Sequence, residues 1–130
     1  MRVALNRVVL YVQDVDRLAA FYQEAFGLSV VEEIKGEWAV LAAGPCQLAL
    51  HRVGKPYRTA DPDWQAESNA KLVLTVDRPI AEMRAALAAK GARMGNIKSY
   101  PPLTGLLCDG KDPEGNVFQL AEPSAAPREG

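Results

Sequence analysis

The sequence repeats one order of elements, and this repeat limits the fold more than any single motif does. An apolar, β-branched run that ends at Val12 is followed by a helical pattern ending at Gly27, and a second such run ends at Val76 before a pattern ending at Gly91. The two pairs have the same separation. Three strand-like segments follow each helical pattern, so the order strand, helix, three strands occurs twice. We therefore predict two modules of the same architecture.

Turn and capping residues set the expected boundaries. Asp14 can cap a helix that begins near Val15, and Pro79 suits the first turn of the second helix. The other strands are expected at 28–34, 37–42, 46–53, 92–99, 105–109 and 116–121. Residues 1–130 then form one domain, with module one at about 4–53, a linker at 54–68, module two at 69–122 and a tail at 123–130.

Composition narrows the class of protein. With 130 residues, 48% of them hydrophobic and 24% charged, the chain can bury one substantial core. A net charge of -1 gives no general attraction to nucleic acid or to anionic membranes, and no apolar run approaches the ~20 residues of a membrane span. Cys46 and Cys108 form one pair at most, which fits a reduced compartment. We expect a cytoplasmic protein with neither a nucleic-acid partner nor a membrane partner.

Two groups of motifs carry a family resemblance. Residues 7–15, Phe21-Tyr22 and 26–28 form a strand, a turn, a helix and a glycine exit, and Asp112-Pro113-Glu114-Gly115-Asn116 is a tight turn whose acid can bond neighbouring amides. In this order the motifs resemble the vicinal oxygen chelate (VOC) superfamily, which includes glyoxalase I, bleomycin-resistance proteins and extradiol dioxygenases. The resemblance implies an α+β fold: two βαβββ modules forming a curled mixed-sheet cup with helices outside. It also implies a homodimer.

Alternation along four strands predicts which side chains face the cup. Apolar residues such as Leu10, Leu50, Leu74 and Leu120 suit the face covered by a helix. The opposite face then receives Arg7, Val9 and Tyr11; Gln47, Ala49 and His51; Lys71, Val73 and Thr75; and Val117, Gln119 and Ala121.

Metal-dependent members of the superfamily hold a divalent ion with one side chain from each of these four strands. The resemblance aligns those positions with Arg7, Ala49, Lys71 and Gln119. Arginine and protonated lysine offer no lone pair, alanine offers no donor, and one amide oxygen is a poor ligand by itself. We therefore predict no metal site and no other cofactor.

Other residues on this face suggest binding. Arg7 and Lys71 could hold a carboxylate or phosphate, unless they pair with Glu37 or another acid or extend to the rim. Tyr11, by alternation, and Trp38 and Tyr100, near strand ends, could contact a planar ligand. The predicted ligand-binding set is Arg7, Tyr11, Trp38, Gln47, His51, Lys71, Thr75, Tyr100 and Gln119.

The leading functional prediction is metal-independent binding of a small aromatic or anionic molecule, as in bleomycin-resistance proteins. The alternative is a divergent VOC enzyme, a lyase, isomerase or dioxygenase, in which His51 and Tyr11 are the candidate catalytic residues or a metal binds after all. A third interpretation is a subunit or sensor whose cup is vestigial. The fold does not separate these, since one scaffold hosts many activities.

Overall fold

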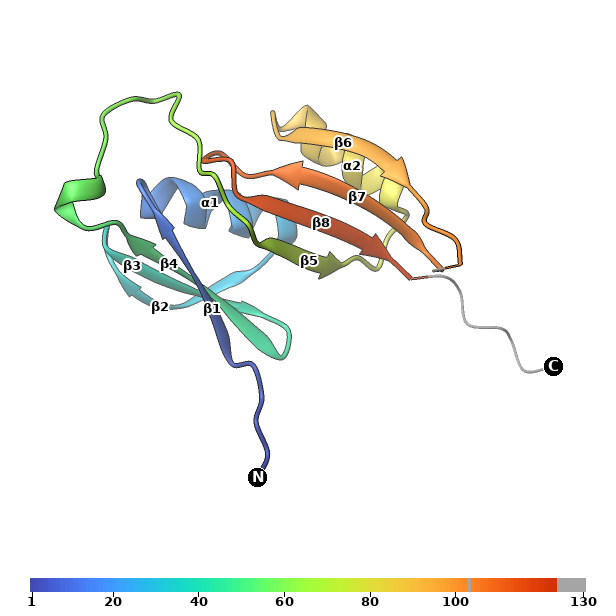
Figure 1. The fold of residues 1–130 in the computed structure, drawn as a ribbon, viewed down its shortest axis with the longest axis horizontal. Helices are drawn as coiled ribbons and strands as arrows, with labels where there is room; N and C mark the ends of the chain where they lie inside the picture. The colour runs from blue at the N-terminus through green and yellow to red at the C-terminus, as the bar shows by residue number, and fades with distance from the viewer. Residues whose placement is uncertain (103, 124–130) are drawn as a thin grey trace. The chain divides into compact units, whose positions relative to one another are not determined.

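The computed structural model describes residues 1–102 and 104–123. The chain divides into two compact units, Met1–Trp64 and Gln65–Gly130 (Figure 1). The tail predicted at 123–130 lies outside the described residues except for residue 123.

The first unit is a four-stranded sheet with one helix. Its elements are β1 (Arg7–Val12), α1 (Val15–Phe26), β2 (Ser29–Ile34), β3 (Trp38–Ala43) and β4 (Cys46–Arg52). The strand order is β1-β4-β3-β2, with β1 parallel to β4 and the other neighbours antiparallel. Helix α1 packs against β2, β3 and β4. The predicted linker begins with a short 3-10 helix, Lys55–Tyr57, where the sequence indicated neither helix nor strand.

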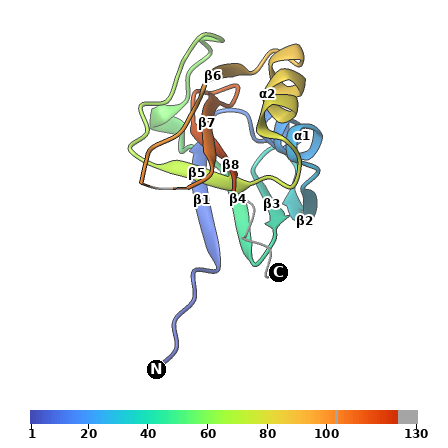
Figure 2. The same cartoon turned by 90° about the vertical axis from the view of Figure 1, so that its right-hand side faces the viewer.

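The second unit repeats this topology. Its elements are β5 (Lys71–Thr75), α2 (Ile80–Ala89), β6 (Arg93–Lys98), β7 (Leu106–Lys111) and β8 (Val117–Glu122). The order is β5-β8-β7-β6, with β5 parallel to β8, and α2 packs beside β6, β7 and β8 (Figure 2). The predicted α+β class with two βαβββ modules is confirmed. No helix among the described residues is long and apolar enough to cross a membrane.

Both ends of the first helix are capped as the sequence predicts. The Asp14 carboxylate accepts a hydrogen bond from the backbone N–H of Arg17 at 3.0 Å, which satisfies one of the free donors at the start of α1. Gly27 follows the last helical residue with φ of 67°, a conformation that favours glycine.

The second helix is capped differently. Pro79 lies at the N-cap, one position before the predicted first turn, and its side chain makes no capping bond. The carboxylate of Glu122 on β8 supplies the acceptor instead, at 3.0 Å from the backbone nitrogen of Ile80. Gly91 has φ of 89° just beyond the helix.

Burial alternates along β1, β5 and β8, but in β4 the consecutive residues Leu48, Ala49 and Leu50 are all buried, so Ala49 is not open to solvent as alternation predicts. In the first unit Leu41 and Leu50 are fully buried with Leu18 and Tyr22 of α1. In the second, Ile80, Leu87, Phe118 and Leu120 are at most 2% exposed. Tyr11, His51, Lys71, Val73 and Thr75 are exposed on the alternate positions. Each sheet therefore buries one face beneath its own helix.

The predicted turn between β7 and β8 is built around one acid. The Asp112 carboxylate accepts from the backbone N–H groups of Glu114 and Asn116, at 2.9 and 3.0 Å. Asp112 is 1% exposed, so these bonds satisfy a charge that burial would otherwise penalise. The turn fixes where β8 begins, and with it the position of Gln119.

Candidate functional site

Five of the predicted ligand-binding residues lie on one face of the first sheet. Across the sheet Arg7 is the register partner of Gln47, and His51 is the partner of both Tyr11 and Trp38. All five have the strand parity opposite to that of the buried leucines Leu48 and Leu50. We call these five residues, Arg7, Tyr11, Trp38, Gln47 and His51, the Arg7–Trp38 face.

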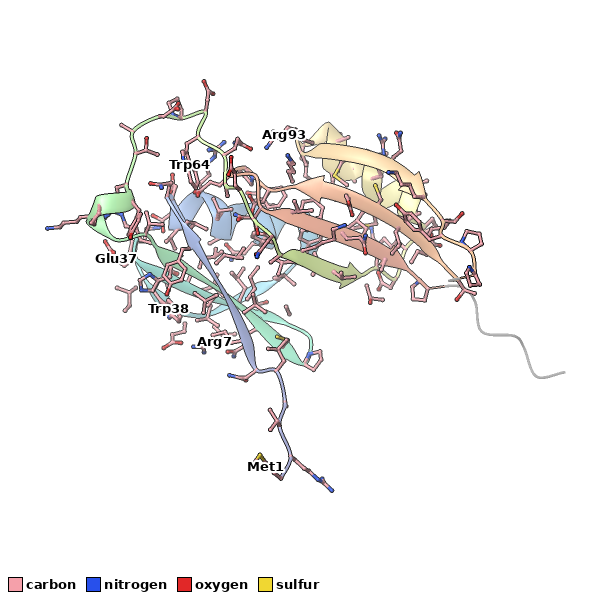
Figure 3. The ribbon with its side chains drawn as sticks, in the orientation of Figure 1. Met1, Arg7, Glu37, Trp38, Trp64 and Arg93 are labelled. Carbon is pink, nitrogen blue, oxygen red and sulfur yellow. The ribbon has the colours of Figure 1, made fainter. Side chains whose placement is uncertain are left out.

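The Arg7 side chain is held by its neighbours on this face. Its Nε and Nη2 both donate to Oε1 of Gln47, at 3.1 and 2.8 Å, and its guanidinium carbon lies 5.5 Å from the centre of the Trp38 ring (Figure 3). On β4, Gln47 is the partner of Arg7 and His51 is the partner of Trp38. Ala49 lies midway between Gln47 and His51, so the contact between Arg7 and Trp38 passes over Ala49. The small alanine side chain leaves room for this contact.

The acid nearest to Arg7 is Glu32, one of the other acids that the sequence left open beside Glu37. Nη2 of Arg7 lies 3.8 Å from Glu32, and the two side chains are 31% and 59% exposed. Glu37 instead binds Arg52 at 3.0 Å. A partly exposed pair at 3.8 Å is a weak ion pair. Glu32 therefore does not saturate the charge of Arg7.

One edge of the Arg7 guanidinium has no hydrogen-bond partner among the described residues. Arginine has five N–H donors, and Gln47 takes one from Nε and one from Nη2. Among the described residues no acceptor lies within hydrogen-bond distance of Nη1. The edge formed by Nη1 and Nη2 is the fork that binds a carboxylate with two parallel bonds.

Three rings stand side by side next to this charge. The His51 imidazole lies 5.2 Å from the Tyr11 ring and 5.7 Å from the Trp38 ring, tilted by 60° and 77°. Tyr11 is 65% exposed. Tilted contacts of this kind stabilise aromatic pairs and leave ring faces and edges open to a further planar group.

The second sheet carries a different cluster. Nζ of Lys71 lies 3.0 Å from Oδ2 of Asp109, and the Gln119 amide donates to Oδ1 of Asp109 at 3.0 Å. Burial raises the pKa of the Asp109 carboxyl, but the hydrogen bonds from Lys71 and Gln119 and the charges of Lys71 and Lys98 outweigh it, so the pKa lies below its ordinary value of 3.8. Asp109 is therefore a carboxylate near neutral pH and neutralises Lys71.

A pocket of about 220 Å³ opens beside this cluster. It is lined by Gly95, Asn96, Lys98, Tyr100, Leu107, Asp109 and Gln119. The structure thus brings Tyr100 and Gln119, both predicted, to one pocket of the second unit. Thr75, also predicted, is exposed at the end of β5 and lines no part of it.

The residues at the four positions that the resemblance aligns with metal ligands do not fit a metal ion. Arg7 offers only donors, Ala49 is a buried methyl group, and the Lys71 ammonium is occupied by Asp109. Gln119 keeps only its amide oxygen, since its nitrogen donates to Asp109. In residues 1–102 and 104–123 no three His, Cys, Asp or Glu side chains are arranged to hold a metal.

Sequence reasoning missed two acids that shape these faces. Asp109 follows the buried Cys108 on β7 and pairs with Gln119, so strand alternation could have assigned it to the open face. Glu32 could not have been assigned in this way, because the register of β2 shifts between Val30 and Glu32.

Cys108 is buried and does not lie on the open face with Asp109. Cys108 is 1% exposed, and burial raises the pKa of its thiol, against the lowering effect of Arg84. Its sulfur lies 3.4 Å from the Gly95 carbonyl oxygen. Both cysteines are free thiols, with Cys46 half-buried. Cys108 is a small buried core residue, as the sequence predicted.

Comparison with known proteins gives one family and many similar folds. A family profile described as a glyoxalase-like domain matches residues 7–121. A solved lactoylglutathione lyase from Agrobacterium tumefaciens superposes with a TM-score of 0.72 at 22% identity, covering 92% of each chain. The fosfomycin resistance protein FosX from Listeria monocytogenes gives 0.74 at 14% identity, covering 95% of this chain and 96% of its own.

A third similar structure is an antibiotic binding protein from a Streptomyces species. Its TM-score is 0.70 at 22% identity, and the match covers 95% of this chain and 98% of that one. At these identities the similarity shows the fold alone. Together with the matched profile, it confirms the resemblance that the motifs predicted.

Proposed function

Because this chain belongs to the glyoxalase-like domain family, we propose that it binds a small aromatic acid on the Arg7–Trp38 face and that this binding needs no metal ion. Arg7 takes the acidic group, and the rings of Trp38 and Tyr11 contact the aromatic part of the ligand.

One observation supports this proposal above the others: the Arg7 guanidinium, whose Nη1 has no hydrogen-bonded acceptor among the described residues, lies over the Trp38 ring with its central carbon 5.5 Å from the ring centre. A carboxylate at the Nη1–Nη2 edge would form charge-assisted bonds, and any planar group attached to it lies within reach of the Trp38 ring. The competing acid, Glu32, is mostly exposed and 3.8 Å away. Lys71 is the weaker candidate for the anion, since Asp109 already neutralises it at 3.0 Å.

The donor set supports the metal-independent part of the proposal. Arg7 and Ala49 supply no lone pair on the first sheet, and Lys71 supplies none on the second. One protein of similar fold is named as an antibiotic binding protein, and this chain shares its architecture at 22% identity. Small-molecule binding is thus the named role of one protein with this fold.

Isothermal titration with benzoate tests the proposal directly. The wild-type protein should bind benzoate, and Arg7→Met should weaken binding by about tenfold or more, since a charge-assisted hydrogen bond contributes roughly 1.5–3 kcal/mol. Arg52→Met is the matched control: it removes an arginine from the same sheet at a position of opposite parity, where Glu37 holds it. It should leave the affinity unchanged.

Three results would contradict the proposal. They are no binding of benzoate, equal losses in Arg7→Met and Arg52→Met, and binding that appears only after a divalent metal is added. The last would favour the divergent enzyme that the sequence leaves as the alternative.

The homodimer and the cytoplasmic location remain predictions from the resemblance and the composition. Multi-angle light scattering of the purified protein would give the number of chains, with a mass of twice 14.1 kDa expected. Fractionation of the source cells would test the location.

A further inference from the structure

His51 is the only histidine in the chain, and its hydrogen bond determines which ring nitrogen carries the proton. Nδ1 lies 2.8 Å from the backbone carbonyl oxygen of Arg52. A carbonyl oxygen can only accept, so Nδ1 is the donor. The hydrogen-bond network thus assigns the neutral ring as the Nδ1–H tautomer, with a bare lone pair on Nε2.

The surroundings of His51 leave that lone pair without a partner. Tyr11 and Trp38 contact the ring at 5.2 and 5.7 Å between ring centres, and no described residue donates to Nε2. His51 is exposed, so the unpaired acceptor carries no penalty while water solvates it. A ligand that displaces this water must offer a donor in return or leave the acceptor unsatisfied.

The same Trp38 ring links this acceptor to the anion-binding edge. The guanidinium of Arg7 and the imidazole of His51 both lie within 5.7 Å of the Trp38 ring centre. A ligand seated on Trp38 therefore faces two hydrogen-bonding groups of opposite kind. Arg7 supplies donors to an acid, and His51 supplies an acceptor.

We propose that His51 is a specificity-determining residue that selects aromatic acids carrying a hydroxyl group away from the carboxylate. This inference rests on the proposed function, because it needs the acid to sit at Arg7. The hydroxyl donates to Nε2 of His51 while the carboxylate binds the Nη1–Nη2 edge. Plain aromatic acids bind less tightly because they leave Nε2 unsatisfied.

Titration calorimetry with four probe acids tests the selection. Either 3-hydroxybenzoate or 4-hydroxybenzoate should bind about threefold to tenfold more tightly than benzoate, as expected for one net hydrogen bond. Salicylate is the matched control ligand, because its hydroxyl bonds its own carboxylate; it should gain nothing over benzoate. In His51→Phe the ratio of the hydroxybenzoate affinity to the benzoate affinity should fall to about one. His51→Gln, whose amide oxygen still accepts a hydrogen bond, should retain part of the preference.

The tautomer gives a second readout that needs no ligand. Because the chain has one histidine, two-dimensional ¹H–¹⁵N spectra of the imidazole contain one set of signals. The ¹⁵N chemical shift of Nδ1 should be that of a protonated nitrogen, and the shift of Nε2 that of an unprotonated one. The Nε2 shift should change when a hydroxybenzoate binds. An Nε2–H tautomer would overturn the inference.

The titration outcomes separate the two proposals. Equal affinities for benzoate and both hydroxybenzoates would overturn the role of His51 and leave the Arg7 site standing. A hydroxyl preference that persists in His51→Phe would do the same. Failure of all four acids to bind would overturn both proposals.

Discussion

The guanidinium of Arg7 reaches across the first sheet to the Trp38 ring, 5.5 Å away, although the two residues lie on strands that are not neighbours. Gln47 holds one edge of the guanidinium and leaves the other open. Arg7, at the start of β1, is therefore a candidate anion-binding residue that lies beside an aromatic ring.

Glu32→Gln should tighten benzoate binding. Of the acids in the described part of the chain, Glu32 is the one paired with Arg7, at 3.8 Å, and its carboxylate competes with the ligand for the same positive charge. An exposed pair contributes about 0.2–1 kcal/mol, so the affinity should rise by about 1.5- to 5-fold. Glu33→Gln is the control, since Glu33 pairs with Ala39 on the alternate face and carries the same charge. An equal or larger gain from Glu33→Gln, measured by calorimetry, would show a general charge effect instead.

Trp38→Leu should weaken benzoate binding by about threefold to tenfold, because an aromatic contact contributes about 0.5–1.5 kcal/mol beyond area. The loss should be smaller than that of Arg7→Met. Trp64→Leu, which changes the other tryptophan, should leave the affinity as it is. An unchanged affinity in Trp38→Leu would show that the ligand lies elsewhere.

Asp109→Asn should lower the free energy of unfolding at neutral pH, and the loss should fade in acid. The folded-state pKa of Asp109 lies below its ordinary value of 3.8, so the carboxylate stabilises the fold above that pH and ceases to do so as pH falls through the lowered pKa. Urea unfolding of both proteins from pH 7 down to pH 3 measures this. The gap between the two stabilities should begin to close as pH falls below about 3.8. A constant gap would mean that the ion pair with Lys71 does not stabilise the fold.

Gly110→Ala should destabilise the second unit by about 1–3 kcal/mol. A Cβ at this position would lie 2.5 Å from the Phe118 ring and 2.6 Å from the Met94 sulfur. Gly54→Ala is the control, because its added methyl group would make only ordinary contacts, the nearest at 3.8 Å. Urea unfolding should give a lower free energy of unfolding for Gly110→Ala than for Gly54→Ala. Equal values would show that Phe118 shifts to make room for the added methyl group.

Much of the fold could be predicted from the sequence, because strand alternation and glycine helix ends are local signals. The period of two in β1, β4, β5 and β8 assigns each side chain to a face, and the turn at Asp112 sets where β8 begins. The repeat of strand, helix and three strands follows in the same way. These signals need no knowledge of distant contacts.

The contacts within the site could not be predicted. Whether Arg7 meets Glu37, Glu32 or Trp38 depends on its rotamer and on the small Ala49 between the strands. The register shift in β2 removes the parity argument for Glu32. The cup that the two modules would form together stays a prediction from the resemblance.

The most direct test of the central claim is benzoate titration of chelator-treated protein whose metal content has been measured, repeated after addition of zinc, nickel, manganese or iron. We predict negligible bound metal, a measurable dissociation constant without it, and the same constant within error after each addition. Stoichiometric metal in the purified protein, together with benzoate binding that the chelator abolishes, would contradict the account.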